Sequence, residues 1–343
     1  MAIYKEFDIQ PQNSAESGDV ITNIKDVVSS GMWANGAGTM TSFFTSSVQS
    51  GSSAEYYLDT FASNPQSDSQ AKSQFSVAYA HFNGSGSLGR MGTTGNRASA
   101  AIYRQLSQTL LGPGEDQFTF AGTGEHIQPK YVFAISVSRQ QLREKMDPGN
   151  WEIKIGTRTF IDDSGATTNP EVNQGGRVFN IVSGSIQSGT AVIKHTATAQ
   201  FGGGYGLFYP DLGMLIFNGP VLNESASLST VTTSNTLGGN SVKFYEKIKT
   251  GAYFQSRREE VITSQHYFCR VPNKEFNFSS NPTFATASDG SFTQATFFKN
   301  PKTFITQVGL YNDAGELLAV AKLSKPLLKS YSREAIIKVK LDF

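Results

Sequence analysis

The chain has 343 residues, 17% of them charged, and a formal net charge of +1. It is too hydrophobic and too weakly charged to be intrinsically disordered, and it is long enough to fold without a disulfide or metal. Its Lys and Arg residues are scattered, so we expect no nucleic-acid partner. It has no apolar run of membrane-spanning length and no signal-peptide pattern at its start, so we expect no membrane insertion.

We expect residues 1–125 to form a mixed α/β region. Residues 19–28 carry apolar side chains at helical spacing, which predicts a helix. Residues 59–82 fit a helix or a strand equally well, because their aromatic residues satisfy both spacings. Residues 96–111 give the clearest helix, which Asn96 can cap and the following Gly-Pro-Gly ends.

Residues 126–252 predict a central β domain. Trp151, Ile153 and Ile155 alternate with charged residues, as in a half-buried strand, so we expect them to line its core. A Ser/Thr/Asn-rich stretch at about 220–240 predicts a surface excursion. The other expected elements are strands at 131–137, 177–182, 190–197, 207–209 and 214–217, two helical turns at 138–145 ended by a turn at 147–149, and a short helix at 242–250.

Residues 253–343 predict a C-terminal β region that can pack with the central domain. Two strands, at 303–311 and 317–323, flank Asn312-Asp-Ala-Gly315 and predict a hairpin. The final residues, 335–343, alternate strictly between apolar and polar side chains, which predicts a strand paired beside that hairpin. Its apolar face is the candidate core or assembly segment: Ile337, Val339, Leu341 and Phe343. The fold class expected for the whole chain is mainly β, with antiparallel, sandwich-like sheets and a minor helical N-terminal region.

Motifs for catalysis or cofactor binding are weak. The glycine pattern at 84–89 lacks the helix and the acidic residue of a dinucleotide site, and the one at 202–206 lacks the ending of a P-loop. Asp162-Asp163 fits a calcium ligand pair, but better a solvated hairpin tip. We therefore predict no catalytic residue, no cofactor and no metal. The histidines lack metal-ligand spacing: His81, His126, His195 and His266.

Two further features each have a plain alternative. Tyr205, Phe208 and Tyr209, beside a glycine loop, could stack on sugars, but core packing is favoured. Cys269, the single cysteine, predicts a buried inert thiol rather than a catalytic thiolate, because His266 lies on the opposite face of a strand.

Several segments resemble the virion structural proteins of T-even-type marine myophages, especially cyanophages, in the same order over most of the chain. The C-terminal block is the most specific part, and residues 220–240 carry none of the likeness. The segments include Lys145-Met-Asp-Pro-Gly-Asn-Trp151, Tyr205-Gly-Leu-Phe-Tyr-Pro-Asp-Leu-Gly213, His266-Tyr-Phe-Cys-Arg-Val271, Lys274-Glu-Phe-Asn-Phe-Ser-Ser-Asn-Pro282 and Lys338-Val-Lys-Leu-Asp-Phe343.

The resemblance implies a non-enzymatic building block of a contractile tail, in the baseplate or neck. Its expected partners are other tail proteins and symmetric copies of itself. It would be located in the virion, and in the host cytoplasm during assembly. Two other functions stay open: a receptor-binding or glycan-binding tail module, and a tail-associated glycan hydrolase.

Overall fold

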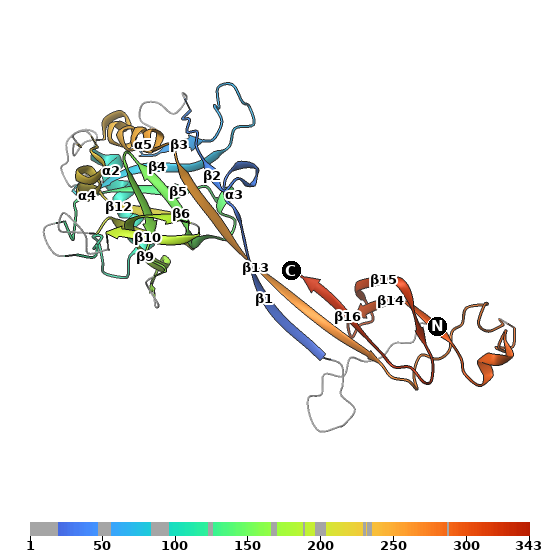
Figure 1. Cartoon of the computed structure of the whole chain (residues 1–343). Coiled ribbons are helices and arrows are strands. Elements are labelled where there is room, and N and C mark those ends of the chain that lie inside the picture. The colour runs from blue at the N-terminus through green and yellow to red at the C-terminus, as the bar shows by residue number, and fades with distance from the viewer. Residues whose placement is uncertain are drawn as a thin grey trace. The chain divides into compact units, whose positions relative to one another are not determined.

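The computed structural model describes residues 20–46, 56–83, 96–122, 126–165, 170–187, 189–195, 204–228, 231, 235–286 and 288–343. It is mainly β, with 47% strand and 17% helix, which confirms the expected fold class. The chain forms two compact units: unit 1 comprises residues 1–27 and 261–343, and unit 2 comprises residues 28–260. Strands β1 (Val20–Gly31) and β13 (Phe254–Val271) each run from one unit into the other (Figure 1).

This division differs from the three expected segments, 1–125, 126–252 and 253–343. Strands from the first two segments lie in one sheet, because β4 (Ser73–His81) pairs with β5 (Tyr131–Val137) along its length. A boundary near residue 125 would therefore cut through the ladder of a single sheet.

Unit 2 is built on antiparallel strands in the order β6-β7-β9-β11-β12-β5-β4-β3, with β13 beside β6 and with β8 and β10 each paired to β9. Its other strands are β2 (Thr39–Met40), β3 (Leu58–Phe61), β6 (Lys145–Ile155), β7 (Arg158–Asp162), β8 (Glu171–Asn173), β9 (Gly176–Gln187), β10 (Thr190–His195), β11 (Gly206–Tyr209) and β12 (Met214–Asn218). Its helices are α2 (Asn96–Leu110), α3 (Arg139–Leu142), α4 (Gly219–Ala226) and α5 (Gly239–Gly251), with 3-10 turns η1 (Ala34–Gly36) and η3 (Thr236–Gly238).

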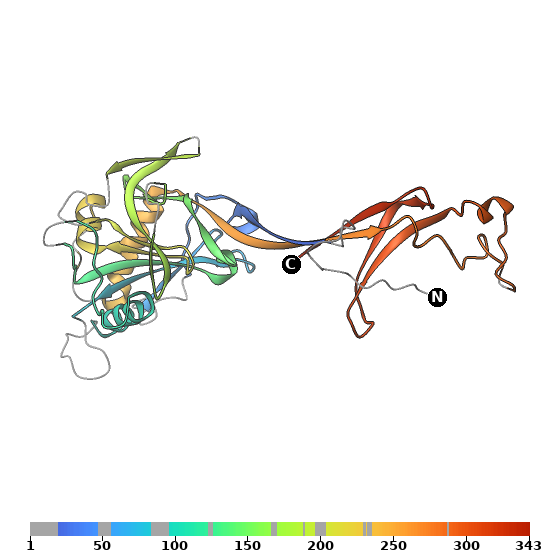
Figure 2. The same ribbon diagram turned by 90° about the horizontal axis from the view of Figure 1, so that it is seen from below.

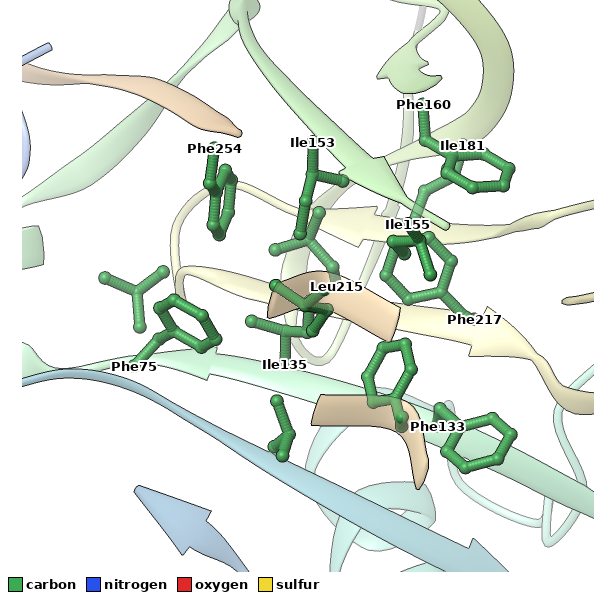
Figure 3. Close-up of a cluster of buried hydrophobic side chains, with 14 of the residues drawn as sticks. Phe75, Phe133, Ile135, Ile153, Ile155, Phe160, Ile181, Leu215, Phe217 and Phe254 are labelled. Atoms are coloured by element: carbon green, nitrogen blue, oxygen red, sulfur yellow. The ribbon is translucent and has the colours of Figure 1, made fainter. Parts of the chain in front are cut away.

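The sheet of unit 2 is covered on both faces. Alternate residues of β5 point to opposite faces and belong to different apolar clusters. Val132 and Ala134 pack in the cluster that also contains the buried residues of α2. Phe133 and Ile135 belong to the larger cluster on the other face, with residues of α4 and α5 (Figure 3). Strands buried on both faces have apolar runs rather than clean alternation, which explains the uninterrupted run of β5. None of the helices in the described residues is long and apolar enough to cross a membrane.

The sheet also curls until its two ends meet. The ring centroids of Phe75 in β4 and Phe254 in β13 lie 5.5 Å apart, although six strands separate β4 from β13 in the strand order (Figure 3). Trp33 completes the closure, since its indole nitrogen donates a 2.8 Å hydrogen bond to the Phe254 carbonyl oxygen. Trp151, Ile153 and Ile155 are fully buried, as predicted.

Several predicted helices and turns are wrong. Residues 19–28 overlap strand β1 rather than a helix, because their many β-branched side chains favour extended backbone over the helical spacing. Of the two structures expected for residues 59–82, helix or strand, the strand is the one that forms, as β3 and β4. At 138–145 only one helical turn forms, α3. By contrast, the helix predicted at 96–111 and the short one at 242–250 are confirmed as α2 and α5.

Two other expectations about exposed segments are also corrected. The turn expected at 147–149 is a bulge within β6, since Met146 lies opposite Arg258 and Trp151 lies opposite Ser256. Gly149 allows it with a φ of 80°. The excursion expected at about 220–240 contains α4, which buries Val221 in the core. Residues 229–230 and 232–234 lie outside the described part.

Unit 1 contains the first part of β1, which neighbours β13, together with two further strand pairings and a small core. Residues 264–271 of β13 pair with β16 (Ala335–Asp342), and β14 (Thr303–Tyr311) pairs with β15 (Leu317–Lys329) as the predicted hairpin. The 3-10 turn η4 (Ala295–Phe298) lies in the connection between β13 and β14. The core cluster consists of buried Val271, Ala335 and Ile337, with the partly buried Phe276, Ile305, Val308, Leu323 and Leu327 packed on it.

The final strand is thus paired, but with β13 and not with the hairpin as predicted. An alternating pattern determines which face of a strand is apolar, but it does not determine which strand pairs with it. Ile337 and Val339 are buried and Leu341 is half-buried, as expected for a core face. Phe343 is 71% exposed, so it does not belong to the core, and of the two roles expected for this segment only the assembly role stays open for it.

Candidate assembly surface

The aromatic residues considered for sugar stacking lie in the core. Tyr205, Phe208 and Tyr209 have no exposed surface. The Phe208 ring packs 5.2 Å from that of Trp151, and the Tyr205 ring 5.4 Å from that of Phe160. Core packing is therefore confirmed, and these rings cannot meet a glycan.

Asp162 and Asp163 are buried, so the prediction of a solvated hairpin tip is wrong. The Asp162 carboxylate accepts hydrogen bonds from the backbone nitrogens of Gly149 and Ser164, at 2.8 and 2.9 Å. Asp163 accepts two from Asn180. Burial raises the pKa of Asp162 above its ordinary value. These carboxylates hold the bulge of β6 against β7 and β9. In the part of the chain that the structure describes, no group of three His, Cys, Asp or Glu could hold a metal ion.

The cysteine and its nearest histidine in sequence, His266, lie on opposite faces of β13. Cys269 is half-buried rather than buried as predicted. In the β13–β16 ladder Cys269 lies opposite Ile337, and His266 lies opposite Lys340. Because the two residues are three positions apart on one strand, their side chains project from opposite faces. His81 and His266 are buried, and His126 lies 3.5 Å from Glu224. The side chain of His195 and the glycine pattern at 84–89 lie outside the described part.

The distinctive surface of the molecule is in unit 1. Within the described residues, unit 1 exposes more large apolar side chains than it buries, and it holds most of those that the chain exposes. Water-exposed apolar surface on this scale marks an interaction site in a soluble protein. Three of these exposed residues lie elsewhere in unit 1, namely Ile24, Val27 and Tyr331. The others lie on the β13–β14 connection, on the hairpin, on β16 and at the residue after it: Phe278, Phe292, Phe298, Phe304, Tyr311, Leu317, Leu318, Val320, Ile336 and Phe343.

The β13–β14 connection carries a group of phenylalanines. We name residues 276–298 the aromatic loop; they include six phenylalanines and one charged residue, Asp289. Phe284 is buried at its centre, with the rings of Phe278, Phe292 and Phe297 at 5.6, 5.6 and 4.9 Å. Phe298 next to them is 80% exposed. Within unit 1 the loop lies at the end opposite the C-terminus (Figures 1 and 2).

The base of the aromatic loop is fixed by a buried lysine. Lys329 at the end of β15 has no exposed surface, and its Nζ donates to the backbone oxygens of Asn273 and Ser330 at 3.0 and 3.2 Å. It also donates to the side chain of Asn277. Three acceptors match the three N–H groups of an ammonium. The loop is therefore anchored on the hairpin.

None of the sequence motifs predicts this surface, although its signal is present in the phenylalanine-rich, nearly uncharged run between 276 and 298. Comparison with known proteins does not assign it either, because no family model, no curated protein and no solved structure matches the chain. Its geometry and chemistry alone define it as a candidate site for protein contacts.

Proposed function

We propose that this protein is a structural component of a contractile phage tail, in the baseplate or neck, and that it acts through contacts with neighbouring proteins. The observation that carries the proposal is the surplus of exposed apolar side chains in unit 1 over its small buried core. The ordered resemblance of the C-terminal segments to myophage virion proteins supports the same role.

The physical reason is the instability that such a surface gives to an isolated unit. Each large apolar side chain that leaves water on binding contributes roughly 1.5–3 kcal/mol. Aromatic anchors carry most of the binding energy in protein interfaces. Phe298 and its neighbours in the aromatic loop have this character, and the anchored base of the loop lowers the entropy lost on binding.

A receptor-binding role is the second candidate, because the aromatic loop combines exposed rings with many Ser, Thr and Asn side chains. Its aromatic residues are all phenylalanines, which lack the polar group by which Tyr and Trp also hydrogen-bond. This chemistry fits an apolar pocket of a protein better than a glycan.

The test is incorporation into particles. Virions are produced with the wild-type chain, with Phe298→Ser, or with the control Val172→Ser, which removes a side chain 75% exposed in unit 2. We expect quantitative mass spectrometry of purified particles to find the wild type and the control at the same fixed copy number, and Phe298→Ser at a reduced one.

Purified particles without this chain would refute the structural role. Incorporation of Phe298→Ser at the wild-type level, together with loss of adsorption to host cells, would favour the receptor-binding role instead. Clearing of a peptidoglycan suspension by the purified chain would indicate a hydrolase.

A further inference from the structure

The three C-terminal strands differ in how their edges are protected. Proteins discourage unwanted pairing at sheet edges with lysine, proline and bulges. β15 carries Lys322, Lys325 and Pro326, and β16 carries exposed Lys338 and Lys340. The nine residues of β14 include no charged residue and no proline.

β14 also has the more regular outer edge of the hairpin. The ladder passes from Gln307 opposite Lys322 to Ile305 opposite Leu327, so the longer irregular stretch is on β15. Among the described residues, β14 pairs with β15 alone. A two-stranded ribbon is marginally stable in water, and a third strand would complete it.

We propose that the outer edge of β14 binds the same strand of a second copy of this chain, antiparallel and about a two-fold axis at Gly309. This inference rests on the proposed function, since it names one partner of the assembly surface. Such an interface uses the same residues on both sides.

Self-pairing is favoured by the residues that it brings together. About Gly309, Gln307 lies opposite Tyr311 of the second copy, and both are exposed on one face. Val308 lies opposite Leu310 of the second copy, both half-buried on the other face. Because β14 has no charged residue, pairing two copies brings no like charges together, and β14 has no charge that would require an oppositely charged partner strand. At the axis, Gly309 has no side chain, which leaves room above the backbone for the larger side chains beside it. The ring of Tyr311 already lies close to it, 2.8 Å from where a Cβ would stand.

The experiment measures the molar mass of the purified full chain by light scattering over a range of concentrations. We expect the wild type to approach twice the 37.2 kDa of one chain. The double variant Gln307→Lys with Tyr311→Lys places lysines opposite each other twice, so we expect the dimer to weaken roughly tenfold or more. The control, Leu318→Lys with Val320→Lys, adds the same charge to exposed positions of β15 and should dimerise as the wild type does.

A charge swap separates pairing from damage to the fold. Gln307→Glu with Tyr311→Glu should also weaken the dimer, and an equimolar mixture of the two double variants should restore it as a heterodimer. A wild type that stays monomeric up to roughly 100 μM would overturn the proposal, as would a lysine variant that dimerises normally or a mixture that fails to recover. Protection of the β14 amides in a monomer would mean that the chain covers this edge itself, which also overturns it. These outcomes leave the particle experiment, and with it the proposed function, unaffected.

Discussion

The Nζ atom of Lys329 lies 3.0 Å from the Oδ1 atom of Asn277, a residue 52 positions earlier in the chain. The pair joins the last residue of β15 to the aromatic loop, inside the unit with the smaller core. Burial lowers the pKa of Lys329, so the fold carries a desolvation cost there, which its three carbonyl acceptors and the nearby carboxylates of Glu275 and Glu334 offset.

Replacing Lys329 with methionine should release the aromatic loop. The change keeps an apolar stem and leaves three carbonyl oxygens without their donor, which costs about 1–3 kcal/mol. Hydrogen exchange should quicken at residues 273–278 and remain unchanged in unit 2. Lys322→Met, at an exposed position of the same strand, is the control. Equal exchange in both variants would contradict the role of Lys329 as an anchor.

Truncating Trp151 to alanine should destabilise unit 2 by about 3–5 kcal/mol, because a large side chain is removed from the core. The indole Nε1 has no hydrogen-bond partner in the described part of the structure. Trp151→Phe removes that unsatisfied group and keeps most of the packing, so we expect it to lose less than roughly half as much. Chemical denaturation of both variants measures the difference, and equal losses would contradict this account.

Deleting residues 335–343 should unfold unit 1 and spare unit 2. The deletion removes Ala335 and Ile337 from a core of three buried residues, and also buried Val339. Each large side chain lost from a core is worth roughly 1.5–3 kcal/mol. Proteolysis should then cleave within 261–334 and leave a resistant core from unit 2. A truncated chain whose residues 261–334 stay resistant would mean that β16 is dispensable.

Asp162→Asn should change how stability depends on pH. The folded pKa of Asp162 is raised, so between its ordinary value of 3.8 and that raised value the folded state binds more protons than the unfolded state. The wild type therefore loses stability as pH rises through this window, and the variant should lack that loss. Melting temperatures across acidic to neutral pH measure it. Asp313→Asn, in the exposed hairpin turn, should keep the wild-type profile.

The sequence predicts features that neighbouring residues determine, and fails for contacts between residues that are far apart in the chain. Local signals succeed: Gly315 adopts a φ of 79° in the hairpin that was predicted around it, and α2 ends where the Gly-Pro-Gly follows. Pairing partners are not local. The alternation of Ile337 and Val339 correctly predicts a buried face, but nothing in it indicates β13 as the neighbour.

The candidate site was missed for a related reason. Apolar side chains are expected in the core, so the phenylalanines around Phe284 are read from the sequence as core residues and do not indicate a surface. Phe298 is exposed while Phe284 is buried, because the loop folds so that Phe278, Phe292 and Phe297 surround the Phe284 ring. Asp162 shows the converse. An Asp-Asp-Ser-Gly run predicts a solvent-exposed turn, but Asp162 is buried because β7 pairs with β9 there and the backbone nitrogens of Gly149 and Ser164 donate to its carboxylate.

Unit 2 is an insertion between two separated parts of unit 1, and this orders the events of synthesis. Strand β1 emerges from the ribosome early, but its neighbour β13 follows only after residues 32–253 have been made. At the usual pace of translation that delay is on the order of ten to fifty seconds. The inserted unit can fold during this time, so the apolar surface of unit 1 forms last. The apolar surface of unit 1 is therefore completed only after the whole of unit 2 has been synthesised.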